Sequence, residues 1–188
     1  DIDDDKDIVA SNGAESKQMD IFRTFYGKDN ELASNLFNAW DFYGVYAISR
    51  REQIKMRKQN PNLPIAKHEF FLNGHTHGIE ITPAILTVDD KRIEYYPSER
   101  EEIVEHALRR IFLEAGGAMH VPGKETWARF TLKQVQNELS SMGHGMTFKA
   151  LKESLDIMAG CKIKVSQNNR KAFEGSILPE RVFTDREE

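Results

Sequence analysis

The sequence predicts an α+β fold, and three observations lead to this expectation. Two segments of the C-terminal half begin at the capping residues Thr131 and Thr147 and then carry apolar side chains at helical spacing. Residues 161–166 alternate between apolar and polar side chains, which is the pattern of a strand with one buried face. Residues 68–97 are rich in β-branched and aromatic residues, which favour strands.

Composition sets the class of protein. The chain has 188 residues, of which 39% are apolar and 30% charged, so we expect one domain or at most two small ones. A single cysteine, Cys161, excludes a disulfide framework and favours a cytoplasmic location, and we interpret it as a small buried residue. Neither a membrane-spanning apolar run nor a phosphate-loop or zinc-ligand motif is present, so we expect no membrane partner, no cofactor and no metal. The chain starts at Asp1 rather than Met, which suggests a fragment of a longer protein.

Charge divides the chain into parts. Residues 1–18 hold six acidic and two basic residues and little apolar content, so we expect a disordered acidic tail. We expect an N-terminal helix and β extension over residues 19–96, a winged-helix domain over 97–179, and a charged tail or linker over 180–188.

In the N-terminal extension, the apolar spacing after Asn30 predicts a helix that ends at Gly44. Strands are expected at residues 70–72, 78–88 and 91–96. Pro83 should make the second strand either an edge strand or a broken one, and Asp89-Asp90 should form a tight turn before the third.

The C-terminal part follows a recognisable order of elements. Ser98 and Glu101 form a capping-box pattern at the start of a long helix, and residues 127–130 read as a short strand. Helices from Thr131 and Thr147 follow, with a glycine-containing turn between them. A two-stranded ribbon comes last, with strands at 161–166 and 172–178 around a polar, mobile tip at 167–171. This order is typical of a winged helix-turn-helix, in which the second helix of the pair contacts DNA.

Basic and polar residues of this unit form the candidate DNA-binding site. The N-terminal turn of the second helix contributes one set, the ribbon a second, and a basic block before Pro61 a third: Thr147, Lys149 and Lys152; Lys164, Asn168, Asn169, Arg170 and Lys171; and Arg50, Arg51, Lys55, Arg57 and Lys58. Two alternatives stay open. The basic block is equally explained as a solvated face. Glu153 and Asp156 beside the two lysines would approach phosphates and so weaken the case for groove contact, which leaves non-specific backbone contact or dimerisation as the alternative.

His75-Thr76-His77 together with Tyr95-Tyr96 resembles the paired histidines and the tyrosine of nicking enzymes. The middle residue of such a pair is apolar, whereas Thr76 is polar here, and the tyrosines precede Pro97 in an expected strand. We therefore expect a polar hairpin with two surface histidines and no catalytic residue.

The segments IEITPA (Ile79–Ala84) and IEYYPSEREEIVEHALRRI (Ile93–Ile111) resemble replication initiator proteins of plasmids and mobile elements. The later stretch Phe130–Val165 resembles the winged helix of the same group, and the resemblance covers roughly Asn35 to Pro179. It implies recognition of origin repeats in double-stranded DNA, self-association as a homodimer and recruitment of host replication proteins, without catalysis.

From the sequence we therefore expect a DNA-binding replication initiator. The alternatives are a winged-helix transcriptional repressor, a dimerisation or protein-interaction module without DNA contact, and a nicking enzyme that uses His75, His77 and Tyr96.

Overall fold

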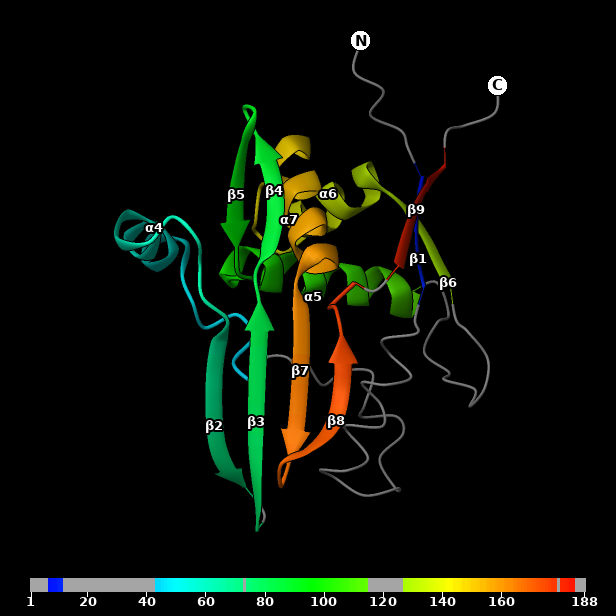
Figure 1. The fold of residues 1–188 in the computed structure, drawn as a ribbon. Coiled ribbons are helices and arrows are strands. Elements are labelled where there is room, and N and C mark those ends of the chain that lie inside the picture. The colour runs from blue at the N-terminus through cyan, green and yellow to red at the C-terminus, as the bar shows by residue number, and fades with distance from the viewer. Residues whose placement is uncertain (1–6, 12–42, 73, 115–126, 179, 185–188) are drawn as a thin grey trace.

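The computed structural model describes residues 7–11, 43–72, 74–114, 127–178 and 180–184, and it has an α+β architecture of helices and antiparallel sheets (Figure 1). The helices of these ranges are α4 (Arg50–Gln59), α5 (Glu99–Glu114), α6 (Leu132–Ser141) and α7 (Phe148–Gly160). The strands are β1 (Asp7–Ser11), β2 (Ala66–Leu72), β3 (His75–Thr82), β4 (Ala84–Val88), β5 (Lys91–Tyr95), β6 (Trp127–Thr131), β7 (Lys162–Gln167), β8 (Arg170–Gly175) and β9 (Glu180–Thr184). No helix in the described ranges is both long enough and apolar enough to cross a membrane.

The strands form three antiparallel sheets, with the orders β2-β3-β7-β8, β4-β5 and β6-β1-β9. The first sheet corrects the expected two-stranded ribbon, because β7 pairs with β3 as well as with β8. The cause lies in the alternation of β3, whose inner residues Ile79 and Ile81 are buried directly beside Val165 and Ile163 of β7. Two strands with matching apolar faces bury more surface together than either buries alone.

The helices supply the other side of the core. The capping box of α6 is present as predicted, because the Thr131 hydroxyl accepts a hydrogen bond from the Gln134 backbone N–H and the Gln134 side-chain Oε1 accepts one from the Thr131 backbone N–H. The apolar positions predicted for both helices of the pair are fully buried, apart from Phe148, which is half-buried: Leu132, Val135, Leu139, Leu151, Leu155 and Met158.

Two pairs of consecutive elements run side by side: strand β3 followed by β4, and helix α7 followed by β7 (Figure 1). Each pair is called a path below. Pro83 separates β3 from β4, as its missing backbone N–H predicts. β4 lies against α7, and the contact is close at Gly160, where a Cβ atom would lie 3.1 Å from that of Ala84. At the other end of β4, Asp89 lies beside Lys149 at the start of α7. The two paths are therefore antiparallel over their whole length.

Both hairpin turns have the residues that their backbone requires. Asp89 and Asp90 have φ angles of 49° and 59°, and Asn168 and Asn169 have 48° and 62°. Asp and Asn tolerate this left-handed region better than other side chains, so the turns expected at 89–90 and 167–171 form here.

The structure differs from the sequence-based expectations at several boundaries. Residues 7–11 lie within the segment expected to be disordered, yet they form β1 between β6 and β9. Their Ile-Val-Ala centre favours a strand once two neighbouring strands offer backbone partners.

The return strand expected at 172–178 is β8 and ends at Gly175. The helix expected after Asn30 lies outside the described residues, although Gly44 does have the positive φ, 65°, expected of a helix-ending glycine.

Removal of a core side chain should reveal the packing between α7 and the sheet. Replacing the fully buried Leu155 by Ala should lower the free energy of unfolding by about 2–5 kcal/mol, because contacts are lost and a cavity remains. Urea titration followed by circular dichroism measures this change. Ile54→Ala is the matched control, because Ile54 is 51% exposed on α4, and it should change stability by less than about 0.5 kcal/mol. Equal losses in both variants would contradict the core assignment.

Candidate nucleic-acid interface

The first group of candidate residues lies at the start of α7. The Thr147 side chain accepts a hydrogen bond from the Ala150 backbone N–H at 3.2 Å, so its hydroxyl caps the helix. Lys149 is exposed and Lys152 is half-buried, and both line a groove of about 500 Å³ between α7 and β4. The other residues that line this groove are Leu86, Thr87, Val88, Asp89, Phe148, Glu153 and Asp156.

The negative charge of Glu153 is compensated by two arginine side chains of the same chain. Its carboxylate lies 2.6 Å from Nη2 of Arg100 and 3.6 Å from Nη2 of Arg50. The acidic residue that weakened the case for DNA contact is thus neutralised by α4 and α5, and the lysines of α7 stand beside a paired carboxylate.

A second carboxylate, Glu101 of α5, is fully buried and joins three helices. Arg50 of α4 donates to it at 3.0 Å, Arg100 at 3.1 Å and the hydroxyl of Ser154 of α7 at 2.9 Å. The backbone N–H and the hydroxyl of Ser98 also donate to it, at 3.0 and 2.7 Å. A buried carboxylate is stable only when its oxygens are paired in this way. The sequence indicated the capping contact with Ser98, but a lone sequence offers no signal for the contacts with Arg50 and Ser154.

Helix α4 uses two of its five candidate residues for packing. The guanidinium carbons of Arg50 and Arg57 lie 4.5 and 4.9 Å from the centroid of the Tyr95 ring, and Arg57 also donates to the Glu94 carbonyl at 2.5 Å. Burial lowers the pKa of Arg50, which reflects the cost of placing a guanidinium there. The remaining candidates of this block, Arg51, Lys55 and Lys58, are exposed.

The turn between β7 and β8 is tied to β3 by Asn168. Its backbone N–H donates to the Thr76 carbonyl at 2.7 Å, and its side-chain Oδ1 accepts from the Thr76 N–H at 3.0 Å. Its Nδ2 lies 2.8 Å from Nδ1 of His75. Asn168 therefore holds the tip that was expected to be mobile, while Asn169 and Arg170 beside it are exposed.

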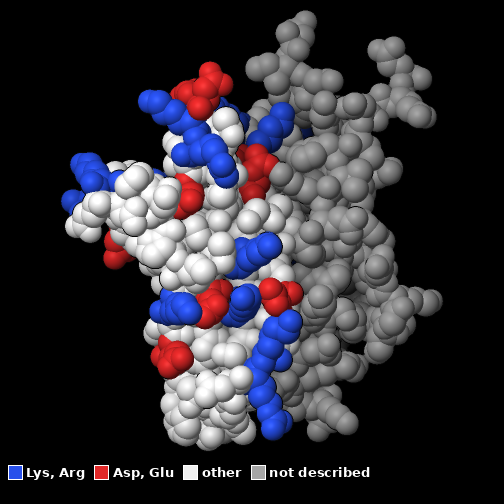
Figure 2. Space-filling model, in the orientation of Figure 1, with Lys and Arg blue, Asp and Glu red and all other residues white. Residues whose placement is uncertain are grey.

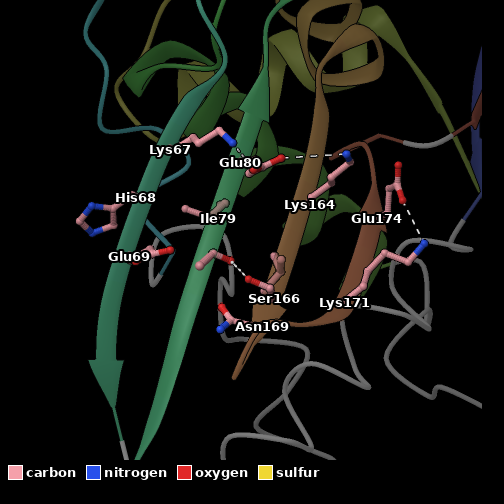
Figure 3. A pocket seen from close by; sticks show the side chains of 12 residues that line it. Lys67, His68, Glu69, Ile79, Glu80, Lys164, Ser166, Asn169, Lys171 and Glu174 are labelled. Atoms are coloured by element: carbon pink, nitrogen blue, oxygen red, sulfur yellow. Dashed lines mark hydrogen bonds and ion pairs between the residues drawn. The ribbon is translucent and has the colours of Figure 1, made fainter.

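Basic and acidic side chains lie beside one another on the face of the molecule seen in Figure 2. Figure 3 shows Lys164 and Lys171 on the four-stranded sheet, each with an acidic neighbour. Lys164 stands between Glu80 of β3 and Glu174 of β8 in the strand register, with its Nζ 4.0 Å from Glu80. Lys171 lies 3.0 Å from Glu174, and this hydrogen bond lowers the pKa of the Glu174 carboxyl. Sequence reasoning missed Glu80 as a neighbour of Lys164, because the register between two strands is not visible in either strand alone, whereas Lys171 and Glu174 lie on the same strand β8.

The candidate residues therefore do not form one surface. The start of α7 lies beside the β4–β5 turn, whereas the β7–β8 turn lies beside the start of β3 at the other end of the two antiparallel paths (Figure 1). A 13-residue helix followed by a six-residue strand separates the two groups, which corresponds to about 40 Å when the elements lie end to end.

The residues of the nicking-enzyme alternative are arranged differently from the expected surface hairpin. His77 is 2% exposed and packs against Phe70, with ring centroids 5.4 Å apart, so only His75 of the pair is a surface residue. Tyr96 is fully buried and its hydroxyl donates to the Pro64 carbonyl, and burial raises the pKa of this phenol. A nucleophile needs access to its substrate, which Tyr96 does not have here. Within the described residues, no three His, Cys, Asp or Glu side chains gather around a common metal position.

Comparison with known proteins finds no match to a family model, to a curated protein sequence or to a solved structure.

The Glu101 cluster predicts a large and specific loss of stability. Glu101→Gln should lower the free energy of unfolding by about 3 kcal/mol, because Arg50 and Arg100 lose their buried counter-charge. Urea unfolding measures the loss. Glu99→Gln, on the exposed side of the same helical turn, is the matched control and should stay within about 0.5 kcal/mol of the parent. A neutral Glu101→Gln would contradict a joining role for this carboxylate.

The single thiol should report on unfolding. Cys161 is fully buried, and burial raises its pKa to about 12, so the reactive thiolate is scarce at neutral and mildly alkaline pH. We expect a disulfide reagent such as DTNB to label the native protein only at the rate of unfolding and to label the urea-unfolded chain at once. Complete labelling of the native protein within the mixing time would contradict the burial of Cys161.

Proposed function

We propose that the chain binds double-stranded DNA as the replication initiator of a plasmid or similar element, through a winged helix made of α5, β6, α6, α7, β7 and β8. In this proposal the N-terminal turn of α7 enters the DNA groove, the protein recognises origin repeats, and it associates as a homodimer. Host replication proteins are its further partners.

One observation carries the proposal. Helix α7 follows α6 across a short turn and begins at one end of the molecule, where Lys149 is exposed and Lys152 lies three residues further along on the same side. The first backbone N–H groups of a helix attract phosphate, because they lack carbonyl partners within the helix and stand at its positive end. Two lysines at such a helix start favour contact with a polyanion.

Nearby charges define which part of this end meets DNA. Lys91 and Arg92 at the start of β5 are exposed and add positive charge, whereas Asp89 and Asp90 at the turn oppose it. Glu153 is already paired with Arg100, so it does not cancel the lysines of α7. The start of α7 is thus a better phosphate contact than the tip of the hairpin beside it.

The position of the β7–β8 turn changes which of the candidate residues we expect to contact DNA together. Because a helix and a strand of these lengths laid end to end span about 40 Å, we expect a duplex seated across the start of α7 not to reach Asn169 or Arg170 in the β7–β8 turn. DNA contact is therefore assigned to Lys149 and Lys152 and not to the wing.

Salt dependence of DNA binding tests this assignment. The double variant Lys149→Ala/Lys152→Ala should lower affinity for duplex DNA and reduce the slope of log affinity against log salt by about two units, one for each lost phosphate contact. Fluorescence anisotropy over a salt series measures both quantities.

Arg170→Ala is the matched control and should leave the slope unchanged. A loss of slope in Arg170→Ala with none in the α7 variant would contradict the assignment to α7. Absence of duplex binding by the parent protein at low salt would contradict the function and favour an interaction module.

A further inference from the structure

The outer face of the sheet β2-β3-β7-β8 carries charges in an ordered pattern. One cross-strand row reads Lys67, Glu80, Lys164 and Glu174 from β2 to β8, so that the charge alternates at every strand (Figure 3). The next row towards the β7–β8 turn reads Glu69, Gly78, Ser166 and Lys171. Both rows are antisymmetric about a line between β3 and β7. Positions equally far from this line carry opposite charges, as Lys67 and Glu174 do, or are both neutral, as Gly78 and Ser166 are.

We infer that this face binds the same face of a second copy of the chain, through a two-fold axis that runs along the strands between β3 and β7. Such an axis exchanges β2 with β8 and β3 with β7 of the partner. Lys67 then faces Glu174 of the second copy, Glu80 faces Lys164, and Glu69 faces Lys171. Every charge of both rows meets its opposite, which is the requirement for an isologous interface.

The middle of this face is concave. A hollow of about 340 Å³ lies over the centre of the sheet, and Gly78 lies within it. A Cβ atom at Gly78 would lie 2.7 Å from the hydroxyl of Ser166 in the same chain, so this hydroxyl lies over the glycine. The same two-fold axis places Ser166 of one copy opposite Gly78 of the other, so neither residue brings a large side chain between the two copies.

The charge balance distinguishes a second copy from DNA at this face. Three lysines and three glutamates form the two rows, and Lys67 already lies 2.5 Å from Glu80 within one chain. A polyanion would meet three carboxylates here, whereas a second copy meets an opposite charge at each of them. Phe71, which is 72% exposed on the same face of β2, adds apolar surface at the edge.

The axis also deepens the proposed function, on which this consequence rests. A two-fold axis along the strands keeps the direction of every strand, so both copies present the start of α7 at the same end of the dimer. One duplex can then contact both α7 helices, while both β7–β8 turns lie at the far end.

Charge reversal tests the interface without any DNA, so its failure and that of the DNA-binding proposal are distinguishable. Sedimentation velocity should show a dimer for the parent protein at low salt and dissociation as salt is raised. Glu80→Lys and Lys164→Glu should each be monomeric, because each variant places like charges opposite one another across the axis.

A mixture of the two single variants gives the sharpest result. Glu80→Lys in one copy faces Lys164→Glu in the other, and the unchanged Lys164 and Glu80 face each other, so the mixture should form a heterodimer. Lys55→Glu on α4 makes the same change of charge at an exposed position and should leave the parent dimer intact. Circular dichroism of each variant confirms that it is folded.

A monomeric parent protein, or variants that fail to associate when mixed although they are folded, would overturn the inference. A monomeric parent whose salt-dependent affinity for duplex DNA falls on Lys164→Glu would overturn it as well, and would assign the face to phosphate contact instead.

Discussion

The pairing of β3 with β7 is the constraint on which the rest of the structure depends. It joins the N-terminal hairpins to the helix pair, and it fixes the direction of everything attached to either strand. Because β4 follows β3 and β7 follows α7, the register of Ile79 with Val165 also brings β4 against α7. The start of α7 and the β7–β8 turn are consequently held at opposite ends of the molecule. A hairpin free to fold back along α7 would have brought the same basic residues together.

A second theme is local compensation of charge. The basic block that stood out in the sequence contributes Arg50 to a buried carboxylate cluster and Arg57 to the Tyr95 ring and the Glu94 carbonyl. The lysines of the sheet alternate with glutamates across the strands. A cluster of positive residues in a sequence is therefore a weak guide to a positive surface, because salt bridges and stacking use part of that charge inside the fold. Lys149 at the start of α7 is among the candidates that stay exposed.

Sequence reasoning succeeded where structure is decided locally. The Thr131 and Thr147 caps, the buried stripe of α7, the break at Pro83 and the turn at Asp89-Asp90 all follow from short-range rules. It did not reach what depends on strand register between distant segments, such as the alignment of Glu80 with Lys164 or the reach of Arg50 to Glu101. One chain contains no covariation from which those partners can be deduced. The winged-helix interpretation depends on both. The order of its helices and strands follows from short-range rules, whereas its contact with a DNA groove depends on how distant segments pack together.

The distance between the start of α7 and the β7–β8 turn tests the central claim most directly. Spin labels at Lys149→Cys and Asn169→Cys, in a chain whose native Cys161 is replaced by Ala, allow that distance to be measured by double electron–electron resonance. Labelling at low protein concentration, in a mixture with excess unlabelled protein, isolates the distance within one chain. The account predicts a single population near about 40 Å, from the rise of a helix and a strand laid end to end. A population centred below about 25 Å would mean that β7 and β8 fold back beside α7, and would contradict the account.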